Sequence, residues 1–79
     1  MSIDYHFAMK DERLLKLGHI IRYTRVKNNL SQEELEEKSG VSRRTISEIE
    51  RGNVDLRYTN LYQLAGAFDM KIREFLKQD

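Results

Sequence analysis

The residues best suited to recognition chemistry lie within residues 30–52, LSQEELEEKSGVSRRTISEIERG. This stretch predicts two short helices joined by a tight turn, and the second helix begins at Ser42-Arg43-Arg44-Thr45. Long hydrogen-bond donors therefore stand at the N-terminal end of a helix, where a helix entering a DNA major groove presents side chains to base edges. We predict from this arrangement a sequence-specific DNA binder and not an enzyme.

The second predicted helix has a buried side and a polar side. Ile46 and Ile49, three residues apart, define the buried side beneath Val41 in the turn. Arginine can bridge O6 and N7 of guanine, and glutamate can accept from N4 of cytosine or orient a neighbouring arginine. The alternative is an ordinary solvated helix face with a mixture of arginine and glutamate. The base-reading set that we predict is Arg43, Arg44, Ser47 and Glu48.

Phosphate contacts are expected at the two ends of this motif. Gln32 is the first residue of the first helix, where a neutral amide can donate to a phosphate oxygen beside free backbone N–H groups. Alternatively, Gln32 is simply a good helix former after a cap. The helix is otherwise acidic (EELEE, residues 33–37), and we expect these carboxylates to point away from DNA. The predicted phosphate contacts are Gln32, Ser42, Thr45, Arg51, Asn53 and Arg57.

Arg25 and Glu50 fall near the core side of their helices. A partly buried ion pair between them would tie the helix that precedes the motif to the helix that reads the bases. Because desolvation offsets much of the Coulomb attraction, we expect such a pair to fix the angle of the recognition helix more than to add stability.

Length and composition limit the other possibilities. Seventy-nine residues make one small domain, and the chain has no cysteine and no proline. Fourteen basic and thirteen acidic residues give a net charge of only +1, so the distribution of charge must carry any argument for nucleic-acid binding. His6 and His19 have no partner at metal-ligand spacing, and we expect no metal, cofactor or small-molecule ligand. Without a long apolar run or a signal-peptide pattern, we expect a cytoplasmic protein that does not bind membranes.

The spacing of apolar residues predicts an all-α chain of five helices. Residues 1–11 lack a clean period and are expected to form a flexible arm before a domain of residues 12–79. The first helix is expected to be capped by Asp11 and to end at Asn28-Asn29, and the second to open with a capping box of Ser31 and Glu34. One face of the first helix is expected to carry Leu14, Leu17, Ile21 and Thr24. The fourth helix carries Leu61, Leu64, Ala65 and Phe68. The last helix carries Ile72, Phe75 and Leu76.

Turn chemistry separates these helices. Gly40 supplies the positive φ that the sharp turn of the motif needs, Ser42 caps the helix after it, and Gly52 stops that helix. Asp69 stands where a glycine is usual between the last two helices, because aspartate tolerates the left-handed conformation better than most residues.

Together these residues resemble the Cro/C1-type (XRE-family) helix-turn-helix domain. The resemblance rests on Leu17-Gly18, Ile21-Arg22, Arg25, LSQEEL at 30–35, GVS at 40–42, TIS at 45–47, IERG at 49–52, and Leu61, Leu64-Ala65 and Phe68. It implies a five-helix, lambda-repressor-like fold and a transcriptional regulator that binds a palindromic operator as a homodimer. It also implies that Gln32 and Arg51 contact phosphates, that Arg25 pairs with Glu50, and that residues 43, 44, 47 and 48 read bases.

Two features are left open by the resemblance. The family often has Pro-Ser-Leu where this chain has Leu56-Arg57-Tyr58, so either Asp55 or Thr59 could cap the fourth helix. The last two helices are expected to form the dimer interface, in part through Phe68, Ile72, Phe75 and Leu76, although some of these must fill the core. A repressor or a restriction–modification controller fits a chain of this size; the alternative is the antitoxin, or protein-interaction module, of a toxin–antitoxin pair.

Overall fold

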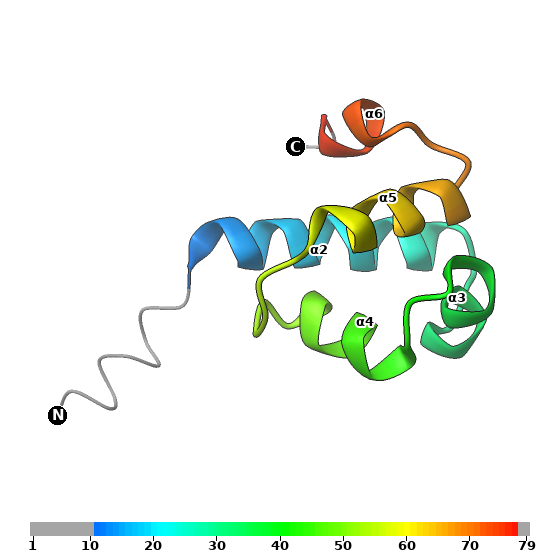
Figure 1. Cartoon of the computed structure of the whole chain (residues 1–79), viewed down its shortest axis with the longest axis horizontal. Coiled ribbons are helices and arrows are strands. Elements are labelled where there is room, and N and C mark those ends of the chain that lie inside the picture. Colours follow the sequence, from blue (N-terminus) through cyan, green and yellow to red (C-terminus); the bar gives the residue numbers. More distant parts are fainter. Residues whose placement is uncertain (1–10, 78–79) are drawn as a thin grey trace, which may run out of the picture.

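The computed structural model describes residues 11–77 and confirms the all-α prediction. Within these residues there is no strand, and no helix is long and apolar enough to cross a membrane. The helices are α2 (Glu12–Lys27), α3 (Gln32–Ser39), α4 (Arg43–Glu50), α5 (Tyr58–Ala67) and α6 (Ile72–Leu76). Figure 1 shows α3 and α4 on one side of the α2–α5 pair and α6 on the other. The expected arm, residues 1–11, falls outside the described residues except for Asp11.

Helix α2 begins and ends as the sequence predicts. The Asp11 carboxylate accepts from the Arg13 backbone N–H (2.9 Å), and a side-chain hydrogen bond from Arg13 contributes most to holding the pKa of Asp11 at about 2. At the other end, Asn28 is the C-cap and Asn29 takes a φ of 58°.

The predicted apolar face of α2 is only partly right. Ile21 and Thr24 are buried, whereas Leu14 and Leu17 are half-buried at the edge of the core. The sequence analysis missed Gly18 and Ile20, which are buried on the same helix.

The local signals around the turn are confirmed. Ser31 and Glu34 form the capping box, with the Glu34 N–H donating to Ser31 Oγ (3.0 Å) and the Ser31 N–H donating to Glu34 Oε1 (2.8 Å). Gly40 ends α3 with a φ of 79°, and Gly52 follows α4 with a φ of 71°. Both glycines therefore have the left-handed backbone conformation that residues other than glycine rarely adopt.

The predicted cap of α5 is wrong. Arg57 is the N-cap residue, and it makes no side-chain capping bond; neither Asp55 nor Thr59 serves. The connection to α6 follows the prediction, since Asp69 has a φ of 59°. Helix α6 then begins with the Lys71 N–H donating to Glu74 Oε1 at 2.9 Å.

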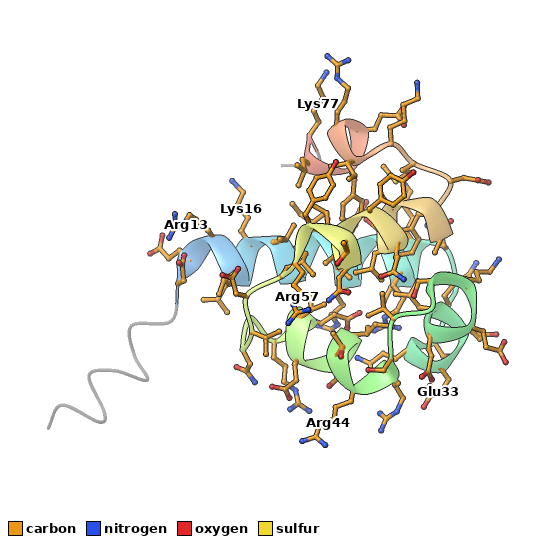
Figure 2. All side chains as sticks on the ribbon, viewed as in Figure 1. Arg13, Lys16, Glu33, Arg44, Arg57 and Lys77 are labelled. Atoms are coloured by element: carbon orange, nitrogen blue, oxygen red, sulfur yellow. The ribbon has the colours of Figure 1, made fainter. Side chains whose placement is uncertain are left out.

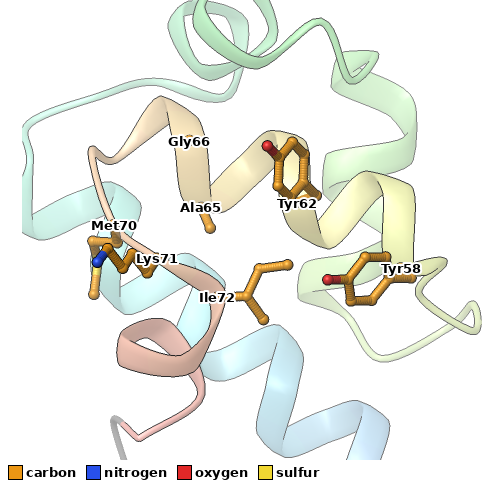
Figure 3. A pocket seen from close by; sticks show the side chains of 7 residues that line it. All are labelled: Tyr58, Tyr62, Ala65, Gly66, Met70, Lys71 and Ile72. Carbon is orange, nitrogen blue, oxygen red and sulfur yellow. The ribbon is translucent and has the colours of Figure 1, made fainter.

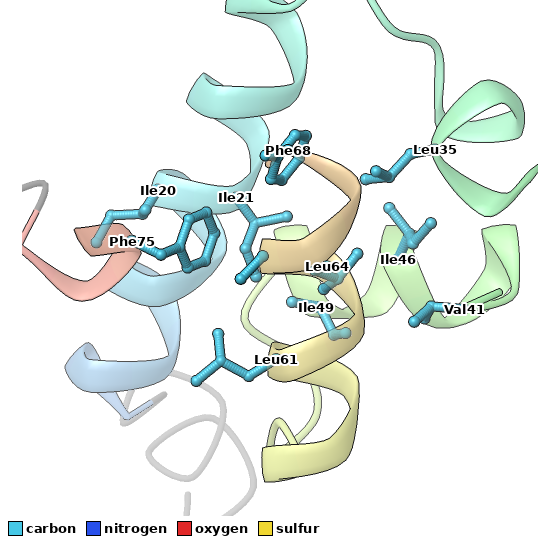
Figure 4. Packing of buried hydrophobic residues seen from close by; sticks show 11 residues of the cluster. Ile20, Ile21, Leu35, Val41, Ile46, Ile49, Leu61, Leu64, Phe68 and Phe75 are labelled. Atoms are coloured by element: carbon cyan, nitrogen blue, oxygen red, sulfur yellow. The ribbon is translucent and has the colours of Figure 1, made fainter. Parts of the chain in front are cut away.

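One apolar core joins all five helices (Figure 4). Its largest fully buried side chains are Phe75, Ile21, Leu35, Ile46 and Leu64, one from each helix. Each such side chain stabilises the fold by roughly 1.5–3 kcal/mol relative to exposure in water. The rings of Phe68 and Phe75 stack with centroids 5.9 Å apart, which fixes α6 on α5.

A close backbone contact seats α4 on α2. A Cβ atom at Gly18 would lie 2.3 Å from the carbonyl oxygen of Ile49 and 3.0 Å from that of Glu50. Because both neighbours are backbone atoms, neither can rotate aside. Only glycine at position 18 therefore allows the last turn of α4 to rest on α2 at this separation.

We predict that Gly18→Ala lowers the free energy of unfolding by roughly 1–3 kcal/mol, the usual cost of overpacking, despite the better helix propensity of alanine. Chemical denaturation followed by circular dichroism measures this. His19→Ala is the control, because His19 is exposed on the same helix and its truncation should change stability by no more than about 0.5 kcal/mol. Equal stability of the two variants would contradict the close contact.

Candidate nucleic-acid interface

The turn between α3 and α4 is held by short side chains. The Val41 N–H donates to Ser39 Oγ (3.0 Å), and the Val41 side chain is buried beneath the turn. Ser42 Oγ accepts from the Thr45 N–H (3.1 Å) and lies 2.8 Å from Thr45 Oγ1, to which it donates. The Thr45 hydroxyl proton is thereby left to donate outward. Ser42 and Thr45 thus lie together at the start of α4, and their contact with phosphates stays a prediction.

The outer face of α4 carries the predicted base-reading residues. Ile46 and Ile49 are buried, so the opposite side of the helix faces solvent. Arg43 and Arg44 are exposed, whereas Ser47 and Glu48 are half-buried. Figure 2 shows Arg44 extending away from α5 and α6, on the side of the molecule opposite Lys77. The structure therefore brings all four residues onto one accessible face.

Glu33 contradicts the expectation that the acidic residues of α3 point away from the recognition surface. Its Oε2 atom lies 3.7 Å from Nε of Arg43, and Figure 2 shows it on the same side of the molecule as α4. The expectation considered only repulsion from phosphates and neglected attraction to the adjacent arginine. The pair is exposed, so it contributes little stability, but it draws Arg43 toward α3.

Glu48 and Arg51 form a second exposed pair, with Oε2 of Glu48 3.5 Å from Nη1 of Arg51. Of the two roles predicted for Glu48, this contact favours the orientation of a neighbouring arginine. Arg51 is the C-cap residue of α4, and the backbone N–H of Asn53 donates to the Glu48 carbonyl (3.0 Å). The end of α4 and the loop after it are therefore held together.

The predicted Arg25–Glu50 pair is present and bidentate. Nε of Arg25 donates to Oε2 of Glu50 (2.7 Å) and Nη2 donates to Oε1 (3.1 Å). The two side chains are only 13% and 5% exposed. The third contact of Arg25 runs from Nη1 to the Leu30 carbonyl at 2.8 Å. The hydrogen bonds that Arg25 donates to the Glu50 carboxylate raise the pKa of Arg25, since they favour its charged form.

Gln32 belongs to the same network. Its Nε2 donates to Oε1 of Glu50 (3.2 Å), so one amide hydrogen serves inside the protein. The sequence analysis considered a phosphate contact or a mere helix former, and the structure adds this third role. The second amide hydrogen is the one that a phosphate could use.

Two surface hollows flank α4 and share no residue. The first, which we call the α2-side hollow, has a volume of about 410 Å³ and is lined by Arg22, Arg25, Gln32, Arg43, Ser47, Glu50 and Arg51. The second, the α5-side hollow, has a volume of about 430 Å³ and is lined by Arg44, Thr45, Glu48, Val54, Asp55, Arg57 and Asn60. Every predicted base-reading residue thus lines one hollow or the other. Among the predicted phosphate contacts, Gln32 and Arg51 line the first, and Thr45 and Arg57 the second.

Comparison with known proteins identifies this arrangement. A family model described as Helix-turn-helix matches residues 21–75. The chain belongs to the Cro/C1-type helix-turn-helix family. It is 40% identical over 60 residues to the uncharacterized HTH-type transcriptional regulator MJ0272 of Methanocaldococcus jannaschii, covering 75% of this chain and 91% of that protein. It also matches the crystal structure of the restriction-modification controller protein C.AhdI from Aeromonas hydrophila, with a TM-score of 0.77, 36% identity, and coverage of 81% of this chain and 97% of that one.

The helix-turn-helix pair of this family is α3 and α4, and α2 supplies a residue that the sequence analysis missed. Arg22 lines the α2-side hollow with Arg43 and Arg51 although it lies outside the pair. The available signal was its spacing, since Arg22 precedes Arg25 by three residues and so shares its helix face. In residues 11–77 no group of three or more His, Asp or Glu side chains could hold a metal ion; His6 lies outside that range.

The four residues expected at a dimer interface differ in how exposed they are within the domain. Phe75 is fully buried and Phe68 is 8% exposed, so both fill the core of this helix-turn-helix domain and are not available to a second copy. Ile72 is half-buried and Leu76 is exposed. The helical period places Phe68 and Phe75 on apolar faces. It does not say whether each face packs against the rest of the domain or against a second copy of the chain.

We predict that Arg25→Met destabilises the domain by about 3–5 kcal/mol, because it leaves the Glu50 carboxylate buried without its cation. The double variant Arg25→Met/Glu50→Leu removes both charges and should recover most of this loss. Urea denaturation of the single and double variants measures the difference. If the double variant is as unstable as the single one, the unpaired charge is not the cause.

Proposed function

We propose that this helix-turn-helix protein is a sequence-specific transcriptional regulator that binds a palindromic operator as a homodimer. The observation that carries the proposal is the outer face of α4, where Arg43, Arg44, Ser47 and Glu48 are accessible between two arginine-lined hollows. A recognition helix in a major groove meets base edges along its crest and a sugar–phosphate backbone on each flank. The arrangement of α4 fits this geometry.

The restriction–modification controller class is the finer proposal. It is supported by the likeness to C.AhdI, whose chain is covered almost completely, so that the match extends beyond the helix-turn-helix pair. A regulator of this class would respond to its own concentration through dimerisation. Selecting bound duplexes from a random library tests the proposal, with a two-fold symmetric sequence of half-sites about one turn of DNA apart as the expected result. Recovery of unrelated sequences would contradict it.

Base reading and phosphate contact are assigned to different residues. In the proposal, Arg43 and Arg44 donate to guanine, while Ser47 and Glu48 adjust the choice of neighbouring bases. Phosphates are contacted by Gln32 through its second amide hydrogen, by the Ser42–Thr45 hydroxyl pair, and by Arg51, Asn53 and Arg57. All of these lie on or beside the two helices or in the loop after α4.

We predict that Arg43→Ala and Arg51→Ala weaken DNA binding in different ways. Arg43→Ala should lose about 1–3 kcal/mol of preference for the selected operator over a scrambled duplex. Arg51→Ala should weaken binding to both duplexes equally and reduce the slope of log affinity against log salt by about 2, which is about 1 for each protomer of the dimer. Fluorescence anisotropy at several salt concentrations measures both effects. An unchanged operator preference in Arg43→Ala would falsify its assignment to base reading.

The dimer surface that we propose combines α5 and α6. Tyr58 and Tyr62 of α5 are 70% and 66% exposed, and Leu76 of α6 is 47% exposed. Figure 3 shows Ile72 pointing toward the two tyrosines, beside a hollow of about 390 Å³ between the helices. Tyrosine is enriched at protein interfaces because it offers a large apolar ring with a polar end. This surface lies across the molecule from α4, which leaves α4 free to enter DNA.

We predict that Tyr62→Glu converts the dimer into a monomer while the fold is retained, because this exposed side chain would place a charge in the apolar interface. Sedimentation velocity measures the mass, and affinity for the palindromic duplex should fall with it. Tyr23→Glu is the matched control, since Tyr23 is an equally accessible tyrosine on α2, 55% exposed. A Tyr62→Glu protein that stays dimeric would place the interface elsewhere.

A further inference from the structure

The α2-side hollow draws its lining from three helices. Arg22 and Arg25 come from α2, Gln32 from α3, and Arg43, Ser47 and Glu50 from α4, with Arg51 at the end of α4. Its volume of about 410 Å³ is many times the ~30 Å³ that one water molecule occupies in the liquid, so it admits a phosphate group.

The charge of this hollow is strongly positive. Four arginines and one glutamate line it, whereas the whole chain has a net charge of only +1. Glu50 is engaged by Arg25 at 2.7 Å, so this buried pair forms a neutral floor. The arginines around the floor are Arg22, Arg43 and Arg51. A concave site with one sign of charge attracts counter-ions of the opposite sign.

Two of the arginines that line this hollow, Arg43 and Arg51, each lie near a carboxylate. Glu33 lies 3.7 Å from Arg43, and Glu48 lies 3.5 Å from Arg51, both beyond the 2.7–2.9 Å of a strong charge-assisted hydrogen bond. Contacts of this length between exposed or partly exposed groups contribute little stability. Arg51 lines the hollow with Arg22, so two guanidinium groups from different helices border the same space.

No ion pair within residues 11–77 accounts for the position of Arg22. It is exposed on α2, and within residues 11–77 no carboxylate pairs with its guanidinium. Its placement three residues before Arg25 sets it on the face of α2 that rests on α4. It is the contribution of α2 to the rim of the hollow.

We propose that Arg22 is a DNA-contacting residue outside the helix-turn-helix pair, and that it binds one backbone phosphate in the α2-side hollow together with Arg51. This inference rests on the proposed function. Arg57 lines the hollow on the other flank of α4, so the recognition helix receives a cationic contact on each side. The phosphate on the α2 side then fixes how deeply α4 enters the groove.

The first test compares Arg22→Gln with Arg73→Gln. Both remove one positive charge, but Arg73 is exposed on α6, on the far side of α5 from α4. Arg22→Gln should weaken binding to the selected operator and to a scrambled duplex by the same factor. It should also make the slope of log affinity against log salt shallower by about 1.8, because one phosphate in each of the two half-sites contributes about 0.9. Arg73→Gln should leave the slope unchanged.

A second arm locates the contact on the DNA. Single methylphosphonate linkages, which are uncharged, are placed in turn along the selected operator. At one position per half-site, this linkage should weaken binding of Arg22→Gln less than it weakens binding of the original protein, because the variant has already lost its contact with that phosphate. Arg22→Lys, which restores the charge, should recover the salt slope and the sensitivity at that position. Thermal melting of each variant, expected to be unchanged, separates this contact from a structural role.

The outcomes distinguish this inference from the function on which it rests. Arg22 does not contact DNA if Arg22→Gln has the same salt slope as Arg73→Gln. The same conclusion follows if Arg22→Gln loses as much affinity as the original protein at every methylphosphonate position. Retained preference for the selected operator would then leave the proposed function intact. If the original protein shows no salt-dependent binding to any duplex, the proposed function itself is wrong.

Discussion

The bidentate contact between Arg25 and Glu50 is the constraint on which the recognition surface depends. It joins the long helix α2 to the last turn of α4, and its other hydrogen bonds reach the Leu30 carbonyl and the Gln32 amide. The Arg25 guanidinium thus binds the loop before α3, and the Glu50 carboxylate at the end of α4 binds the first residue of α3. A buried ion pair is weak evidence for stability, but it penalises any other arrangement of the charges it contains. The angle of α4 is held by this requirement and by the apolar core beneath it.

The distribution of charge resolves the apparent conflict between a near-neutral chain and a role in binding a polyanion. The arginines of α2, α4 and the loop gather around two hollows, while glutamates of α3 and α4 stand at their margins. The carboxylates of Glu33 and Glu48, beside Arg43 and Arg51, lower the general attraction to DNA, most of which carries no operator. Sequence-independent binding is electrostatic, so such a balance favours the specific complex over the unspecific one.

Local signals in the sequence were sufficient for the helices and the turn. The capping box at Ser31, the positive φ of Gly40 and the cap at Ser42 each depend on a few neighbouring residues, and all are confirmed. The Arg25–Glu50 pair was also predicted, because both residues fall near buried faces. The cap of α5 was not predictable in the same way, since its N-cap residue, Arg57, makes no side-chain bond.

Contacts between helices account for what the sequence analysis missed. Glu33 was expected to avoid the surface that it joins, because its attraction to Arg43 exists only once α3 and α4 are packed. Arg22 gained a place in the site by the same packing. Phe68 and Phe75 show the converse case, because a periodic pattern identifies an apolar face without saying whether α6 or a second molecule covers it.

The absence of a side chain at Gly18 has a consequence for how this protein could acquire new operators. The backbone of α4 touches α2 so closely that substitutions cannot easily wedge the two helices apart or tilt one on the other. The position of α4 on α2 is therefore fixed, whereas its outward side chains can be replaced. Under the proposed function, relatives would diverge by replacing the outward side chains at positions 43, 44, 47 and 48, so that the preferred bases change while the packing of α4 on α2 is kept.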